Sequence, residues 1–325
     1  MIDKIAEALG VSKTTVSRAI SGNGRVSEKT RERILRYTAE IGYVPNAAAS
    51  NLATTKTRNI AFSMPLSRDA TRSAYFLECF FGVSRMALKA SYDVIMIGDK
   101  LEQITRVIQS RKADGMVLTR NIIGDGALAK LACAHIPIVL TGVTSVPNVM
   151  QVFYDSVEAF KDLTWRLIDL WKGDIGLIVT NKAYPANQAR AHAFTDAVMA
   201  RGLPAPVIAW DADSEDEMGR ALHFMCESGI RNIICGDDVI CAALLNIIKG
   251  GGGFEDESEM VKMSYENINL ASFHDSHYLK TFHPDIPVVA LDPGKLGAAA
   301  CELLLNKIEG RDAPLTTQLD FKFRI

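Results

Sequence analysis

The sequence predicts an α/β protein with a small all-helical head and a larger core that contains two parallel sheets. Two observations support this fold class. Residues 1–46 show helical spacing of apolar side chains with glycine breaks, whereas from Asn59 onward short β-forming runs alternate with helical stretches. Such alternation predicts parallel sheets that are covered on both faces. Eight or more strands are too many for one small doubly wound sheet, so we expect two subdomains with a cleft between them.

Three short helices are predicted in the head. The first carries an apolar stripe and ends at Gly10; the stripe consists of Ile2, Ile5, Ala6 and Leu9. Ser12 can cap a second helix, which turns Val16, Ala19 and Ile20 inward. The outer side of that helix then carries Lys13, Thr14, Ser17 and Arg18. Ser27 can cap a third helix that ends at Gly42, and its inner side is expected to carry Ile34, Leu35, Thr38 and Ile41.

The arrangement of these helices points to DNA. Two helices joined by a short turn that contains glycine form a helix-turn-helix, whose second helix enters the major groove. Short polar residues near the start of that helix can reach base edges there. A three-helix protein-binding module shows similar periodicity, so the pattern alone leaves protein binding open.

The charge is divided unevenly along the chain. Residues 1–58 carry ten basic and five acidic side chains, a balance of +5, whereas the remainder carries 26 basic and 33 acidic ones, a balance of -7. A cationic end on an anionic body is expected when only that end meets a polyanion. A helical surface can also hold many basic residues for solubility, and charge alone leaves both interpretations open.

The core is expected to contain eight strands or more. The apolar runs that predict them lie at 60–64, 94–97, 115–118, 138–140, 175–179, 207–208, 232–235 and 268–271. Helical stretches lie between them at 75–91, 157–171, 187–201 and 237–249. Ligands of such folds bind at the carboxyl ends of the strands, so the cleft is the candidate ligand site.

The composition is that of a globular protein. The chain has 325 residues, of which 48% are hydrophobic, and a net charge of -2, values that exclude a disordered or collagen-like chain. No apolar run approaches the roughly 20 residues of a membrane helix, and no secretory leader pattern opens the chain. The six cysteines form no CxxC pair, so we expect reduced thiols, no membrane association and a cytoplasmic location.

Enzyme and metal motifs are incomplete. His274, His277 and His283 lie close in sequence, but no cysteine or acidic pair completes a zinc pattern. Lys249 and the glycines after it lack the ending of a phosphate loop, and no nucleophile elbow occurs. We therefore expect no catalytic residue, no metal and no cofactor.

The head is similar to that of a known family. The string IAEALGVSKTTVSRAISGNGRVSEKTRERILRYTAEIGYVPNAAASNLAT closely resembles the head of the lactose-repressor (LacI/GalR) family of bacterial transcription regulators. The resemblance implies that residues 1–46 bind operator DNA through the second helix. It assigns base reading to Lys13, Thr14 and Arg18 and supporting contacts to Ser12, Thr15 and Ser17. An arginine such as Arg18 can bond guanine O6 and N7 in a bidentate manner.

The same resemblance implies a hinge helix and linker at residues 47–58. Asn46 matches a position close to the phosphate backbone, and Ala49 matches a small position that lets a partner hinge approach. Leu52 matches an apolar wedge that two hinges insert together into the minor groove, which bends the DNA. Ser50 stands where many relatives have an arginine, so one contact of the family is missing here.

The core resembles the family's effector core, a pair of subdomains like those of periplasmic binding proteins. The phrases DGMVL, IPIVLTG and ALDPGKLGAAACELLLNKIEG carry this resemblance. The core then covers residues 59–325, with an N-subdomain at 59–156 and 286–315 and a C-subdomain at 157–285 and 316–325. The effector-binding residues implied by the resemblance are Tyr75, Phe76, Arg190, Asp238 and His274.

These features lead to two classes of function. The first is a sequence-specific DNA-binding regulator, a repressor of carbohydrate-related genes, that binds a palindromic operator as a homodimer and a sugar or sugar derivative in the cleft. His274 replaces the aspartate that usually binds sugar hydroxyls in the family, and Arg68 and Arg72 lie in a long first loop, which favours an anionic effector. The alternative is a small-molecule binding or sugar-processing protein whose head is only a protein-interaction module.

Overall fold

The protein folds into two compact units, Met1–Thr57 and Arg58–Ile325. The computed structural model describes residues 1–21, 24–43, 56–66, 74–120, 123–250, 265 and 267–325. The predicted hinge contacts of Asn46, Ala49 and Leu52 lie outside the described residues, as do Arg68 and Arg72. No helix in the described part of the chain has the length and apolar character that a membrane crossing requires.

The first unit consists of three helices around a small core. They are α1 (Ile2–Leu9), α2 (Lys13–Ser21) and α3 (Glu28–Glu40), as the sequence predicts. Gly10 ends α1 in the left-handed conformation, with a φ of 63°. The hydroxyls of Ser12 and Ser27 accept the amide protons of Thr15 and Thr30 and so cap α2 and α3.

The inner face of α3 is narrower than the sequence predicts. Ile34 is fully buried and Thr38 is 7% exposed, and they lie four residues apart on one side of the helix. Leu35 and Ile41 are each 44% exposed, so their assignment to the inner face is wrong. Each residue is rotated by about 100° from the one before it, which turns Leu35 away from the stripe of Ile34.

In its described residues, the second unit contains two six-stranded sheets with the same strand order. The sheet of the N-subdomain has the order β11-β5-β4-β3-β1-β2, and its strands are β1 (Asn59–Met64), β2 (Asp93–Gly98), β3 (Gly115–Leu118), β4 (Ile138–Thr141), β5 (Met150–Tyr154) and β11 (Thr316–Leu319). The sheet of the C-subdomain has the order β12-β10-β9-β8-β6-β7, and its strands are β6 (Ile175–Ile178), β7 (Val207–Ala209), β8 (Asn232–Cys235), β9 (Asn269–Ser272), β10 (Val288–Ala290) and β12 (Lys322–Arg324). Neighbouring strands run parallel except β10 and β12.

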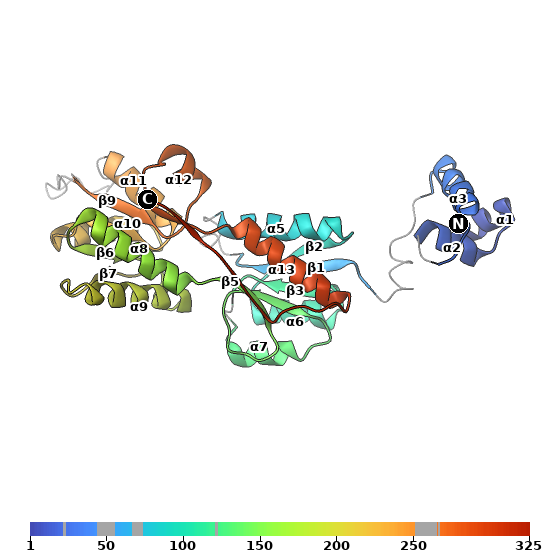
Figure 1. Cartoon of the computed structure of the whole chain (residues 1–325), viewed down its shortest axis with the longest axis horizontal. Coiled ribbons are helices and arrows are strands. Elements are labelled where there is room, and N and C mark those ends of the chain that lie inside the picture. The colour runs from blue at the N-terminus through green and yellow to red at the C-terminus, as the bar shows by residue number, and fades with distance from the viewer. Residues whose placement is uncertain (22–23, 44–55, 67–73, 121–122, 251–264, 266) are drawn as a thin grey trace. The chain divides into compact units, whose positions relative to one another are not determined.

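Helices cover both sheets (Figure 1). Those of the N-subdomain are α5 (Tyr75–Lys89), α6 (Leu101–Gln109), α7 (Asp125–Ala132) and α13 (Pro293–Ile308). Those of the C-subdomain are α8 (Ser156–Trp171), α9 (Pro185–Ala200), α10 (Glu215–Glu227), α11 (Asp238–Gly250) and α12 (His277–Phe282). The backbones of α5 and α13 touch, since a Cβ at Gly82 would lie 2.0 Å from the Gly294 carbonyl oxygen and one at Gly297 2.0 Å from that of Cys79.

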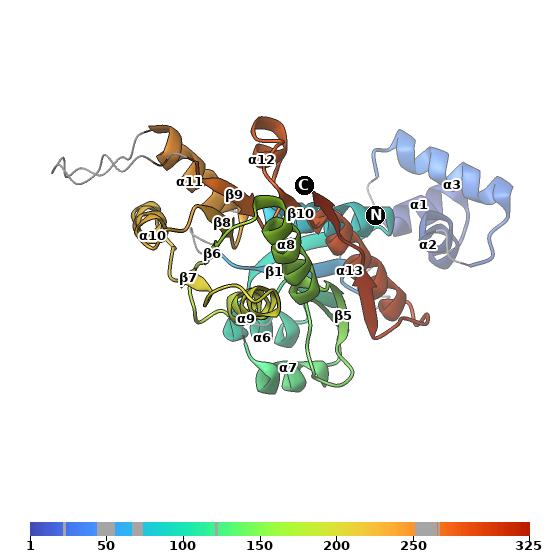
Figure 2. The ribbon, with the colours of Figure 1, turned by 60° about the vertical axis from the view of Figure 1, so that its left-hand side comes forward.

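The chain crosses between the subdomains at three places. The first crossing follows β5 and leads into α8 at Asp155, which caps that helix. The second lies between β10 and α13 and the third between β11 and β12. These last two lie a few residues beyond the predicted boundaries at 285 and 316, because β10 pairs with β9 and β11 pairs with β5. Figures 1 and 2 show the final segment running from one subdomain to the other.

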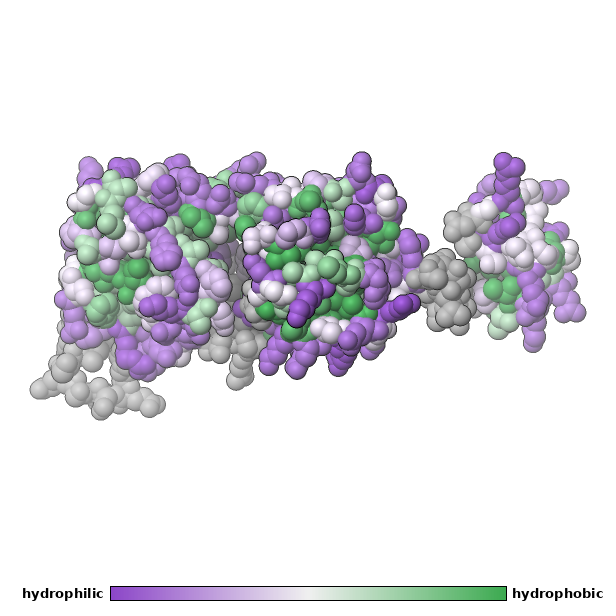
Figure 3. Space-filling model, turned by 90° about the horizontal axis from the view of Figure 1, so that it is seen from below, coloured by the Kyte–Doolittle hydropathy of each residue, from purple (hydrophilic) through white to green (hydrophobic). Residues whose placement is uncertain are grey.

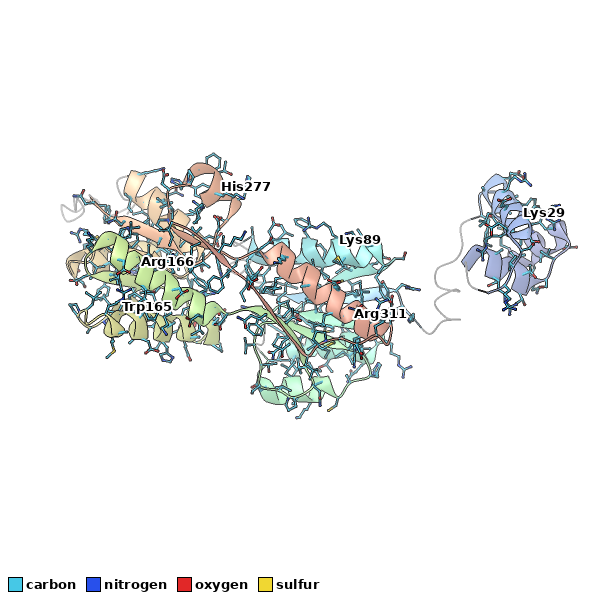
Figure 4. All side chains as sticks on the ribbon, viewed as in Figure 1. Lys29, Lys89, Trp165, Arg166, His277 and Arg311 are labelled. Carbon is cyan, nitrogen blue, oxygen red and sulfur yellow. The ribbon has the colours of Figure 1, made fainter. Side chains whose placement is uncertain are left out.

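Side chains tie the crossing segments to their surroundings. The Tyr154 hydroxyl donates to the carbonyl oxygen of Asp292 over 2.9 Å and accepts its amide proton over 3.2 Å. Because Tyr154 ends β5 and Asp292 caps α13, this hydroxyl joins the first crossing to the second. At the third, the guanidinium carbon of Arg166 on α8, which is labelled in Figure 4, lies 4.5 Å from the ring centre of Phe323.

Candidate functional site

The outer face of α2 carries the polar residues that the sequence selects for DNA contact. Lys13, Thr14, Ser17 and Arg18 are exposed. Ser12 and Thr15 are bonded to each other, with their hydroxyl oxygens 2.8 Å apart, and close the first turn of the helix. The helix therefore presents four exposed polar side chains, and its inner side is held by the buried side chains of Val16 and Ala19.

Arg18 lies against Gly24, three residues beyond the end of α2. A Cβ placed on Gly24, which has a φ of 97°, would lie 2.9 Å from Cδ of Arg18 and 3.1 Å from its Cγ. The absence of a side chain at this position thus leaves room for the arginine stem. A larger residue at Gly24 would both strain the backbone and displace Arg18.

One contact connects α2 to α1, and another connects α3 to α1. Lys13 forms an ion pair with Asp3, and the hydrogen bond from Lys13 holds the pKa of Asp3 below its ordinary value. Arg33 of α3 donates to the carbonyl oxygen of Leu9, near the C-terminal end of α1. The Lys13–Asp3 pair is exposed on both sides, so the lysine can exchange its carboxylate partner for a phosphate at little cost.

The predicted cleft residues lie where the strand order of the two sheets reverses. In the N-subdomain the reversal is between β1 and β3, and in the C-subdomain it is between β6 and β8. Helix connections leave these neighbouring strands in opposite directions, which opens a crevice at their carboxyl ends. Figure 3 shows the two subdomains as separate lobes with a narrow hollow between them.

Arg190 on α9 is held by three neighbours in the C-subdomain. Its Nη1 donates to Asn187 Oδ1 over 3.2 Å, its Nη2 lies 3.5 Å from His274 Nε2, and its guanidinium carbon lies 4.8 Å from the ring centre of Phe273. Its Nε is buried and has no hydrogen-bond partner among the described residues. Burial lowers the pKa of Arg190, an effect that the charge of Asp237 opposes. The guanidinium is thus oriented, and its Nε–H is a buried donor without a partner among the described residues.

His274 follows β9 and joins the two walls of the cleft. Its ring stacks on that of Tyr75 from the N-subdomain, with the centres 5.2 Å apart and an interplanar angle of 18°. Burial, and to a smaller degree Arg190, lowers the pKa of His274 to about 3, so the ring is neutral near pH 7. Because an arginine can only donate, the contact with Arg190 requires an unprotonated Nε2 on His274. The Ser272 hydroxyl, which donates to the His274 carbonyl, fixes the backbone here.

The aromatic pair at the start of α5 lines the opposite wall. Tyr75 and Phe76 meet edge to face, with their ring centres 5.5 Å apart. Burial raises the pKa of Tyr75, so its hydroxyl stays protonated. Tyr75, His274 and Arg190 are thus in one contact chain, as expected of a shared site.

The acidic residues at the start of α11 have different roles. Asp238 is 8% exposed, and Asp237 accepts the amide proton of Ile240 over 2.9 Å and so caps the helix. Burial raises the pKa of Asp237, while the Ile240 amide and the Arg190 charge oppose this shift. Asp237 is therefore the carboxylate whose field reaches Arg190.

Three residues of this site were not selected from the sequence: Asn187, Asp237 and Phe273. Asn187 precedes Arg190 by three positions, so both lie on one face of α9, and this spacing was a usable signal. Phe273 and Asp237 are direct neighbours of selected residues, but nothing in the pattern distinguished their roles.

The three histidines of the sequence 274–283 do not converge. His274 lies in the cleft, His277 is exposed at the start of α12, and His283 lies 3.4 Å from Lys249 Nζ. Among the residues that the structure describes, no three His, Cys, Asp or Glu side chains form a metal-binding group.

Comparison with known proteins identifies both units. Residues 1–46 match the family model described as bacterial regulatory proteins, lacI family, and residues 66–324 match that of the periplasmic binding proteins and sugar binding domain of LacI family. The ribose operon repressor of Haemophilus influenzae is 26% identical over 94% of this chain and 91% of its own length.

Solved structures have the same fold. The lac repressor dimer bound to operator and the anti-inducer ONPF has a TM-score of 0.81 at 17% identity and covers 99% of this chain and 96% of its own. The transcriptional regulator CelR in complex with cellobiose has a TM-score of 0.66 at 21% identity, over 100% of this chain and 98% of its own. The chain therefore belongs to the LacI family of DNA-binding transcriptional regulators, which are not enzymes.

Proposed function

We propose that this regulator binds a palindromic operator as a homodimer and represses carbohydrate-related genes in response to a sugar-like effector with an anionic group. The observation that carries the DNA part is the row of exposed polar side chains on α2, led by Lys13 and Arg18. They stand on a unit whose balance is basic, while the rest of the chain is acidic. Two such heads on one dimer match the two half-sites of a palindrome.

Exposed apolar side chains support self-association through the core. Leu77, Phe81 and Leu88 are 45%, 46% and 65% exposed and share one face of α5, and Met96 on the edge strand β2 is 44% exposed. On α12, Phe282 is 67% exposed. In the view of Figure 1, α5 and α12 both lie along the upper edge of the core. Apolar side chains that gather on one surface are typical of a protein interface.

The test of dimerisation is sedimentation of charged variants. Phe81→Glu and Leu88→Glu should each shift the protein toward the monomer, because an unpaired carboxylate would be buried between the subunits. Leu170→Glu is the matched control, since Leu170 is 53% exposed on α8. Equal sedimentation of all variants and the wild type would exclude this face.

DNA binding is tested by selecting sites from a random library and measuring the affinity in rising salt. We expect a palindromic consensus and an affinity that falls steeply with salt, because phosphate contacts release counterions. Failure to enrich any site, or capture of proteins instead of DNA by the isolated head, would support the protein-interaction module.

The charge and geometry of the cleft support the anionic effector. Arg190 is oriented by Asn187, and its buried Nε has no hydrogen-bond partner among the described residues. A planar guanidinium matches a carboxylate or phosphate. His274 brings a neutral ring to the position where relatives usually have a carboxylate, so this wall repels an anion less.

Calorimetric titration with glucose, glucuronate and glucose 6-phosphate tests the effector class. We expect an anionic sugar to bind and Arg190→Gln to weaken it at least tenfold, whereas Arg201→Gln, which removes an exposed pair with Asp169, should not. Tight binding of the neutral sugar alone would refute the anionic class and leave the DNA proposal intact.

A further inference from the structure

Arg120 connects the two walls of the cleft. It lies two residues beyond the end of β3, and its Nε donates to Oδ2 of Asp99 over 2.7 Å. Asp99 directly follows β2, so both partners belong to the N-subdomain. The guanidinium carbon also lies 5.5 Å from the ring centre of Tyr184, a residue of the C-subdomain. One side chain thus reaches from one subdomain to the other.

The contacts fix the guanidinium in position and orientation. The side chains of Arg120 and Asp99 are 25% and 9% exposed, so this ion pair is better shielded from water than the surface pairs Lys13–Asp3 and Arg220–Asp216. The ring of Phe76 lies 5.8 Å from the same guanidinium carbon. Such distances allow attraction between the cation and the aromatic rings.

Tyr184 connects this contact to the helix that carries the predicted ligand-binding residue Arg190. It immediately precedes Pro185, the first residue of α9, and its carbonyl oxygen accepts the amide proton of Asn187. The same helix carries Arg190. A constraint on the Tyr184 ring therefore acts on the start of the helix that presents Asn187 and Arg190 to the cleft.

We propose that Arg120 is a positioning residue that holds the cleft closed, anchored by Asp99 on one wall and engaged with the Tyr184 ring on the other. The contact then stabilises the closed cleft even when no ligand is bound. An effector that binds the closed form gains affinity in proportion to the fraction of protein already closed. The proposal rests on the proposed function only in that the effector is expected to bind in this cleft. The contacts of Arg120 and the experiment that tests them involve neither effector nor DNA.

The test is a distance measured across the cleft by pulsed electron resonance. Cys133, at the end of α7, is exposed, whereas the other five cysteines are buried, so it can be labelled without removing them. The second label is attached through Met199→Cys on α9, where the native side chain is 65% exposed. Both labels leave the residues of the proposed contact unchanged.

We expect a short principal distance in the parent protein and an added population at longer distance in Arg120→Ala and in Tyr184→Ala. The double variant should resemble either single one, because both remove the same contact. Tyr184→Phe, which keeps the ring, should behave as the parent. Arg120→Lys, which keeps the charge but not the planar group, should lie between the parent and Arg120→Ala.

The control is Arg220→Ala, which removes an exposed ion pair within α10. An unchanged distance in Arg120→Ala would overturn the proposal, as would a shift in the double variant equal to the sum of the single shifts. Thermal unfolding of each variant checks that the core is folded. If Arg120→Ala does not fold, Tyr184→Ala decides, since Tyr184 is 41% exposed and its truncation leaves the Arg120–Asp99 pair in place.

Discussion

The outer face of α2 and the cleft between the subdomains present basic side chains in opposite ways. The side chain of Lys13 is 72% exposed, and that of its carboxylate partner Asp3 is 63% exposed. Arg190, in contrast, is held by Asn187 and lies over the ring of Phe273. An exposed cation exchanges partners easily and suits a polymer that offers many phosphates, whereas an oriented and shielded cation selects one ligand geometry. Substitutions at the two sites should therefore differ in the size of their free-energy effects and in how those effects depend on pH and salt.

The largest effect is expected from a substitution that destabilises the head and leaves the core folded. Ile34→Ala opens a cavity in the small core of the head, where the native side chain is fully buried, and should cost about 2–5 kcal/mol of the head's stability. A helical unit of this size has little stability to lose, so DNA binding should be lost while ligand binding by the core persists. Circular dichroism during heating should show an early transition of the head alone.

Leu35→Ala is the control for that experiment, since Leu35 is the exposed neighbour on the same helix. It should change stability by less than about 0.5 kcal/mol. Equal losses in the two variants, or a concerted loss of head and core, would contradict the division of the chain into independent units.

A smaller effect should appear in the cleft as a dependence on pH. The pKa of His274 is about 3 in the folded protein and near 6.5 when the histidine is solvated. Between these values the unfolded chain binds a proton that the folded chain does not, so the free energy of unfolding falls as the pH drops below about 6.5. The slope from this residue is at most about 1.4 kcal/mol per pH unit.

Urea unfolding of the wild type and His274→Gln between pH 7 and pH 4 measures this contribution. Other groups titrate in the same range, so the difference between the two proteins is the relevant quantity. Their curves should diverge at acid pH, with the wild type losing more stability. Parallel curves would mean that His274 is solvated, and His135→Gln, the loss of an exposed histidine, serves as the matched control.

The smallest of the three effects concerns Arg18. Arg18→Ala should cost about 1–3 kcal/mol of binding free energy and relax the preference at one base pair. The dependence of the affinity on salt should change by no more than the loss of one phosphate contact would cause. Competition binding against operators with single base changes measures this. An equal loss of affinity for every operator sequence would instead show that Arg18 contacts a phosphate, which is a role that the exposed Lys13 can also take.

The same contrast explains how far the sequence could be interpreted. In the head, the caps Ser12 and Ser27 and the stop at Gly10 are local signals, and the structure places α1, α2 and α3 between them. Only the width of the inner face of α3 was overestimated, because Leu35 and Ile41 are apolar yet exposed. Apolar character alone does not state which side of a helix is covered.

The cleft depends on pairs that are distant in sequence. The stack of Tyr75 on His274 and the contact of Arg120 with Tyr184 join residues whose proximity is set by strand order and by the three crossings. The resemblance to the family implies that Tyr75, Arg190 and His274 bind the effector, and the structure brings these three residues into contact. It could not show that Asp237 acts on Arg190 or that Arg120 has a partner on the other wall, since those are properties of the folded surfaces.

The hydroxyl group of Tyr154 has a mechanical consequence. It forms hydrogen bonds with both the amide and the carbonyl of Asp292, so two of the three chain segments that join the subdomains are bonded to each other. Changing the separation of these two crossings would require stretching or breaking the two hydrogen bonds, so the bonds oppose independent movement of the crossings when the subdomains move.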